Sequence, residues 1–136
     1  MKNCFKALLY ILIFSFAGCD KDANIDAKLQ GSWELRHMLG IQIAGMSPDF
    51  PPENGHIVKF EDDSYQIYDK GKLLLSTTFK IESEQREIDG TVYSEKIVYL
   101  DSGYKTSVFF KISGNTLKIC YGSIAVDGGT STYRKK

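Results

Sequence analysis

The sequence predicts an all-β protein, folded as an eight-stranded antiparallel up-and-down barrel. Three observations indicate this class. Apolar and polar residues alternate with a period of two in most segments after residue 30, turn residues separate these segments, and none has the period of a long helix. The chain is also rich in aromatic residues, with eight Tyr and eight Phe, and has only three Pro. This composition is typical of strands.

The first predicted strand covers residues 31–39, where Trp33, Leu35 and His37 share one face. Residues 40–55 then break the alternation with three Pro and three Gly, which predicts a long loop. Apolar side chains on such a loop suggest that it covers something or meets a protein partner. These side chains are Ile41, Ile43, Met46 and Phe50.

Seven further strands are predicted, joined mostly by short turns that contain Gly. They cover residues 56–60, 65–68, 72–81, 91–100, 104–112, 117–121 and 130–134. A charged stretch, residues 82–90, is predicted to connect two of them. Short links place sequential strands side by side, and closure of the sheet removes exposed edges. A closed barrel is therefore favoured over a two-sheet sandwich, which is the alternative.

The N-terminus has the build of a secretory signal. Lys2 and Lys6 precede an apolar run over residues 7–14, which is shorter than the about 20 residues needed to span a bilayer. We expect residues 1–18 to be removed, which leaves a tether over residues 19–28 and one domain over residues 29–136. The signal holds two of the 17 basic residues and none of the 17 acidic ones, so the mature net charge is −2. This charge does not favour a nucleic-acid partner.

The end of this signal resembles the lipobox of bacterial lipoproteins, on the residues Ala17-Gly18-Cys19, although Phe16 stands where that motif usually has Leu. In that family the thiol is acylated and the chain is cut before it. The resemblance implies that Cys19 anchors the chain to a membrane by several acyl chains, which makes anchoring stable. Residues 20–22, Asp-Lys-Asp, are similar to tags that sort lipoproteins to the bacterial outer membrane. Both its periplasmic face and the cell surface remain alternatives for the location of the chain.

Gly31-Ser32-Trp33 resembles the G-x-W signature of lipocalins, and the ending DGGTSTYRKK is similar to the closing strand of small bacterial lipocalin-like lipoproteins. The resemblance implies a structural plug at the closed end of the barrel. In it, Trp33 packs under a basic side chain of the last strand, for which Arg134 is the matching position. A cation over an indole face would contribute about 0.5–2 kcal/mol.

No catalytic constellation is evident, and we expect neither an enzyme nor a cofactor. The chain has two His, without the spacing of a metal site. After Cys4 and Cys19 are assigned to the N-terminus, only Cys120 remains, and alternation predicts it on the less buried face.

The remaining functional candidate is the barrel interior. An eight-stranded barrel is about wide enough to be filled by side chains or to hold one small ligand. The predicted ligand-binding residues are Leu35, His37, His56, Tyr65, Leu75, Thr77, Phe79, Tyr104, Val108 and Phe110. Two hypotheses stay open: a binder of a small hydrophobic molecule, and a non-enzymatic protein-interaction or inhibitor module with a filled barrel that meets its partner at residues 40–55.

Overall fold

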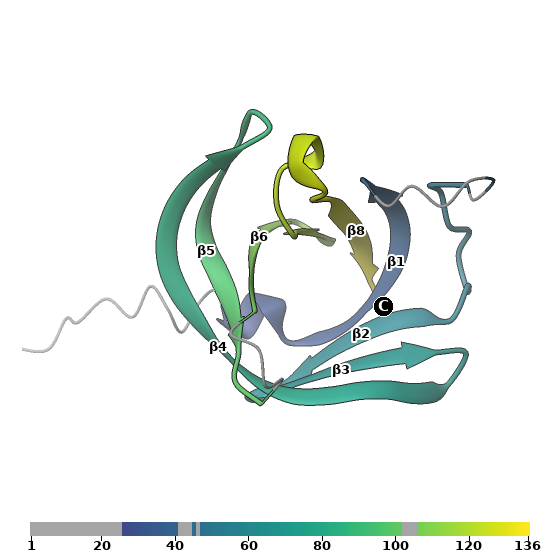
Figure 1. The fold of residues 1–136 in the computed structure, drawn as a ribbon. Helices are drawn as coiled ribbons and strands as arrows, with labels where there is room; N and C mark the ends of the chain where they lie inside the picture. The colour runs from purple at the N-terminus through teal and green to yellow at the C-terminus, as the bar shows by residue number, and fades with distance from the viewer. Residues whose placement is uncertain (1–25, 41–44, 46, 102–105) are drawn as a thin grey trace, which may run out of the picture.

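A computed structural model describes residues 26–40, 45, 47–101 and 106–136 (Figure 1). The signal, Cys19 and the tether up to residue 25 lie outside the described residues, as do Tyr104, Ile41, Ile43 and Met46.

The all-β prediction is confirmed, because eight antiparallel strands form one sheet. The strands are β1 (Gly31–Leu39), β2 (His56–Glu61), β3 (Ser64–Asp69), β4 (Lys72–Ile88), β5 (Thr91–Tyr99), β6 (Ser107–Ser113), β7 (Thr116–Cys120) and β8 (Thr130–Lys135). Each strand pairs with the next one in the sequence, and β8 pairs with β1, so the hydrogen-bonded order closes on itself. Figure 1 shows the strands curving round a common centre.

The strand directions give this sheet two ends. At one end, here called the mouth, β1 ends and β2 begins, and residues 47–55, 70–71 and 121–129 of the connections lie there. The third of these contains a short 3-10 helix, η1 (Ile124–Val126). At the other end, here called the base, lie the turns after β2 and β6 and a helical turn over residues 26–29 that precedes β1.

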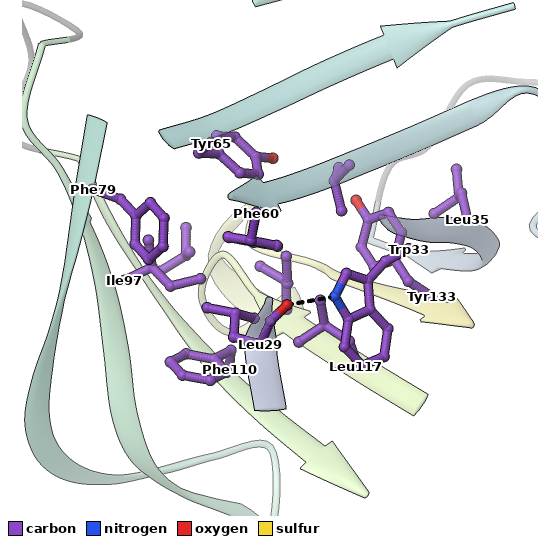
Figure 2. Close-up of a cluster of buried hydrophobic side chains, with 13 residues drawn as sticks. Leu29, Trp33, Leu35, Phe60, Tyr65, Phe79, Ile97, Phe110, Leu117 and Tyr133 are labelled. Carbon is purple, nitrogen blue, oxygen red and sulfur yellow. Dashed lines mark hydrogen bonds between the residues drawn. The ribbon is translucent and has the colours of Figure 1, made fainter. Parts of the chain in front are cut away.

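Inward-facing side chains of all eight strands, together with Leu29, form one apolar core (Figure 2). Its buried members are Leu29, Trp33, Leu35, Val58, Phe60, Tyr65, Phe79, Ile97, Val108, Phe110, Leu117, Ile119 and Tyr133. The period-two alternation read from the sequence is the cause, since successive side chains of a strand point to opposite faces. Burial of this set is the main source of stability, because the described residues contain no disulfide.

The largest departure from the predicted elements is the length of β4. The strand runs through to Ile88, whereas the sequence predicted its end at residue 81 and a charged connection after it. The charged side chains are accommodated because they pair across strands: Lys96 of β5 lies 3.2 Å from Glu82 and 2.7 Å from Glu84. A bulge between Ser83 and Arg86 then redirects the strand.

Beyond this bulge, residues 84–94 form a hairpin arm. β5 pairs with β6 only over residues 95–98, so the arm extends past the pairing of the closed sheet. Tyr93 of the arm packs with Phe109 and Cys120 in a second apolar cluster, and the Arg86 guanidinium lies 5.0 Å from the centre of the Phe109 ring. Cys120 is therefore only 1% exposed, and its prediction on a less buried face is wrong. The hairpin arm that covers Cys120 was not predicted from the sequence, which is why the prediction failed.

The tip of the hairpin arm is fastened to the connection between β7 and β8. Asp89 accepts hydrogen bonds from the Ile124 backbone N–H at 3.0 Å and from the Ser123 hydroxyl at 2.7 Å. Figure 1 shows this hairpin rising beside η1. The Ile124 N–H first, and the Ser123 hydroxyl second, hold the pKa of Asp89 below its ordinary value. Hydrogen bonds to a carboxylate stabilise its charged form.

We expect this contact to make stability depend on pH in a defined direction. Because the folded pKa of Asp89 is lowered, its contribution is present above the unfolded pKa of about 4 and is lost as pH falls through the folded pKa. Asp89→Asn, which tolerates the same left-handed φ of 48°, should therefore unfold at lower urea than the wild type at pH 7, with a gap that closes below pH 4. Asp127→Asn, at φ 58°, is the matched control, and an equal gap for it would contradict the assignment.

A candidate binding site at the mouth of the sheet

The base of the sheet is plugged by Trp33. Its side chain is 0% exposed, and its indole Nε1–H donates a hydrogen bond of 2.7 Å to the Leu29 carbonyl oxygen (Figure 2). The cation over the indole is Lys135, whose Nζ lies 5.1 Å from the ring centre. The predicted cation, Arg134, is exposed and pairs in register with Glu34, whereas Lys135 stands opposite Trp33. Neighbouring residues of a strand point to opposite faces of the sheet, so Lys135 lies on the same face as Trp33 and Arg134 lies on the other.

The middle of the interior is filled by aromatic rings. The ring of Phe60 lies 5.0 Å from that of Tyr65 and 5.3 Å from that of Phe79, and Tyr65 in turn lies 5.0 Å from Tyr99. Burial raises the pKa of Tyr65, so this phenol stays uncharged in the core. Six predicted ligand-binding residues are buried and fill the interior of the sheet with their neighbours: Leu35, Tyr65, Thr77, Phe79, Val108 and Phe110.

A hollow of about 280 Å³ opens above this filled level, and we call it the mouth hollow. Its walls are mainly apolar, and its floor side includes Leu35 and Val58 of the core. Of the nine predicted ligand-binding residues that the structure describes, only Leu35 and His56 line it. The apolar residues of the lining are Leu35, Met38, Ile57, Val58, Ile67 and Leu74, and three Tyr, 68, 121 and 133, complete this part of the wall.

Two predicted residues are absent from this lining for reasons of register. A β-bulge between Leu35 and His37 breaks the alternation of β1, so that Met38 lines the hollow and His37 turns to the loop, where its Nδ1 lies 2.7 Å from Asp49 Oδ1. A second bulge, between Ile67 and Tyr68, shifts the pairing of β3 with β4. Leu75 is 44% exposed, and Leu74 lines the hollow in its place. Sequence alternation alone gives no signal for either bulge.

The residues of the hollow that carry polar groups are His56, Asp69, Ser131 and the three Tyr. Asp69 is the last residue of β3 and pairs in register with His56, the first residue of β2. His56 Nδ1 lies 3.0 Å from Asp69 Oδ1, but the geometry is not that of a hydrogen bond, and this buried oxygen has no hydrogen-bond partner. Sequence analysis missed five of these residues as members of this site, although Tyr133 continues the inward alternation of β8: Tyr68, Asp69, Tyr121, Ser131 and Tyr133.

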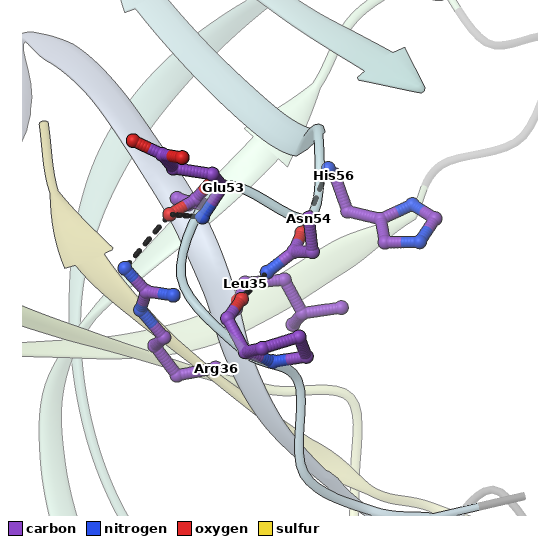
Figure 3. Close-up of polar contacts among 7 residues, drawn as sticks. Leu35, Arg36, Glu53, Asn54 and His56 are labelled. Atoms are coloured by element: carbon purple, nitrogen blue, oxygen red, sulfur yellow. Dashed lines mark hydrogen bonds and ion pairs between the residues drawn. The ribbon is translucent and has the colours of Figure 1, made fainter. Parts of the chain in front are cut away.

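The loop before β2 holds His56 in place. The side chain of Asn54 donates hydrogen bonds to the carbonyl oxygens of Leu35 at 2.8 Å and Pro51 at 2.6 Å, and its Oδ1 accepts one from the His56 backbone N–H at 2.9 Å (Figure 3). The ring of Phe50 meets the His56 ring edge-on, at 5.6 Å between centres. The end of the predicted loop over residues 40–55 is thus a support of the hollow.

The same loop also covers a buried charge on β1. Glu34 is buried, and its Oε2 lies 2.7 Å from Arg36 and accepts a hydrogen bond of 3.2 Å from the Glu53 backbone N–H (Figure 3). Removal of the cation that pairs with a buried carboxylate strongly destabilises the folded protein. The hydrogen bond from the Glu53 N–H to Glu34 joins the loop to β1.

A second hollow, of about 310 Å³, lies at the base beside the hairpin arm. It is lined by Lys28 of the helical turn, Val92 and Glu95 of β5, and Phe110 and Lys111 of β6, among others. It opens where β5 and β6 cease to pair. Its charged lining suits a mostly apolar ligand less well than the mouth hollow does.

Comparison with known proteins adds no family, since no family model, no curated protein and no solved structure matches the chain. Within the described residues, no three His, Cys, Asp or Glu side chains are grouped closely enough to hold a metal ion. No helix of the described part of the chain is long and apolar enough to cross a membrane.

Proposed function

We propose that this chain is a lipid-anchored, lipocalin-like binding protein of the bacterial cell envelope that holds one small hydrophobic molecule in the mouth hollow. The observation that carries the proposal is the hollow itself: apolar walls, a few polar groups on one side, and a floor of tightly packed core side chains. Small-molecule sites have this composition. The closed strand order and the plug of Trp33 under a cation of β8 support the likeness to lipocalins.

The volume sets a limit on the ligand. About 280 Å³ lies at the lower end of the range of about 300–1,000 Å³ for small-molecule sites. Because the core below the hollow is filled, the ligand must be compact and must sit at the mouth. Long lipids that thread through a barrel do not fit this arrangement.

A neutral fluorescent dye, N-phenyl-1-naphthylamine, tests the proposal on the folded mature domain. We expect a saturable rise in its fluorescence with one site per chain. Leu74→Glu places a charge in the wall at a residue that is already 58% exposed, so the fold should tolerate it while dye affinity falls at least tenfold.

Val126→Glu is the matched control, because Val126 is an exposed apolar residue of η1 outside the lining. It should leave dye affinity unchanged. An absence of saturable binding, or an equal loss in both variants, would contradict a ligand site in the mouth hollow.

A second candidate is a protein partner at the mouth, and one observation favours it. Leu73, Leu74 and Leu75 are consecutive and all exposed, although neighbouring residues of a strand face opposite sides. Leu39 and Tyr121 add exposed apolar surface at the same end. Exposed apolar side chains at one end of a sheet are typical of an interaction site. If the mouth binds a protein instead of a small molecule, the titration with N-phenyl-1-naphthylamine should not show saturable binding at one site per chain.

The anchoring part of the proposal rests on the lipobox resemblance and is tested separately. In a bacterial host that processes lipoproteins, the wild-type chain should partition into the membrane fraction. Cys19→Ser should shift most of it to the soluble envelope fraction, since no thiol remains to be acylated. Equal membrane retention of the two chains would contradict lipid anchoring at Cys19.

A further inference from the structure

We infer that the molecule bound in the mouth hollow carries a hydrogen-bond donor, best supplied by a cationic amine, that meets Asp69. This inference rests on the proposed ligand site and adds the chemical class of the ligand. Its basis is the one carboxylate in the lining of the hollow, Asp69, whose side chain is 39% exposed and whose Oδ1 has no hydrogen bond.

Asp69 differs from the other groups in the described part of the chain that lack a partner. Only three buried side-chain atoms there have no hydrogen bond: Glu34 Oε1, Arg36 Nη1 and Asp69 Oδ1. The first two belong to one ion pair of 2.7 Å under the loop before β2. Asp69 is the one that lines a hollow, and its side chain is 39% exposed, so that a ligand in the hollow can reach its carboxylate group.

The neighbours of Asp69 form no hydrogen bond with its Oδ1. His56 Nδ1 is 3.0 Å away, without the alignment of a hydrogen bond. Lys72 stands directly opposite Asp69 in the register of β3 with β4, yet the described ion pairs include none between them. A carboxylate beside apolar walls that is only partly solvated is unfavourable, so a ligand that brings a hydrogen-bond donor to its exposed side relieves this cost.

The other residues of the lining indicate the chemistry of the rest of the ligand. Leu35, Val58 and Ile67 offer apolar surface beside Asp69, and Ser131 and Tyr133 offer hydroxyl groups on β8. An aryl or alkyl amine matches this arrangement, with the amine at Asp69 and the apolar body on the wall. A carboxylate of the same shape would meet a like charge, which disfavours it.

Three probes with the same apolar body separate the head group from the body: 4-phenylbutylamine, butylbenzene and 4-phenylbutyrate. Their affinities for the folded mature domain are measured by titration of amide and methyl NMR signals. We expect shifts at Leu35, Val58 and Ile67 for each bound probe. The amine should bind at least tenfold more tightly than the carboxylate, because a charge-assisted hydrogen bond replaces a repulsion.

Asp69→Asn should reduce the preference for the amine to less than threefold and leave butylbenzene affinity within twofold of the wild type. Asp63→Asn removes an equal charge at the opposite end of β3 and should leave the preference intact. A carboxylate that binds as tightly as the amine, or a preference that survives Asp69→Asn, overturns the inference while the ligand site stands. If none of the three probes shifts the signals of the hollow, the proposed function and this inference both fail.

Discussion

Replacement of Trp33 by Ala is expected to lower the free energy of unfolding by about 3–5 kcal/mol, the range for loss of a large buried aromatic side chain. Trp33 is 0% exposed, and Leu29 of the helical turn packs in the same core. Its removal would leave the Leu29 carbonyl oxygen without the indole donor and Lys135 without the ring beneath it. Urea denaturation followed by circular dichroism measures the change, since Trp33 is the only Trp and its fluorescence is lost in the variant.

Two milder variants divide this effect into its parts. Trp33→Phe keeps an aromatic ring and removes the hydrogen bond to Leu29, which should cost about 1–3 kcal/mol. Lys135→Met keeps an aliphatic side chain and removes the cation, which should cost about 0.5–2 kcal/mol. If Trp33→Ala proved no worse than Lys135→Met, Trp33 would not be the plug of the base.

Much of the fold could be predicted because one physical rule governs most of it. Inward residues such as Leu35, Val108 and Phe110 alternate with polar ones, and a half-buried strand requires this pattern. The hairpin arm could not be predicted this way. Glu82 and Glu84 look like a solvated connection in the sequence, and they fit a strand only because Lys96 lies across from them.

The site was less predictable than the fold, because its members depend on local register. The bulge in β1 exchanges His37 for Met38, and the bulge between β3 and β4 brings Leu74 to the hollow instead of Leu75. Asp69 was missed for another reason. In the sequence it follows the strand predicted over residues 65–68 and precedes a turn, a position where Asp is common. Only the pairing of β3 with β2 brings it to His56.

The second large effect is expected at Gly128, in the connection between β7 and β8. A Cβ at this position would lie within 2.5 Å of the carbonyl oxygens of Gly122 and Ser123, which are backbone atoms and cannot rotate away. Gly128 also donates its N–H to Ser123 at 2.8 Å, so the connection cannot widen without loss of that hydrogen bond. Gly128→Ala should therefore cost about 2–3 kcal/mol, as overpacking does.

Gly114→Ala provides the contrast that separates steric crowding from backbone strain. Gly114 has a φ of 56° and open space round it, so Ala there should cost only about 1–2 kcal/mol.

Gly128→Ala and Gly114→Ala should also differ in ligand binding. Tyr121 and Ser131 line the mouth hollow on either side of the connection that Gly128→Ala displaces, whereas Gly114 lies at the base. Gly128→Ala should thus weaken binding of N-phenyl-1-naphthylamine under conditions where it is still folded, and Gly114→Ala should not. Equal dye affinity in the two variants would show that the backbone contact of Gly128 stabilises the fold without shaping the hollow.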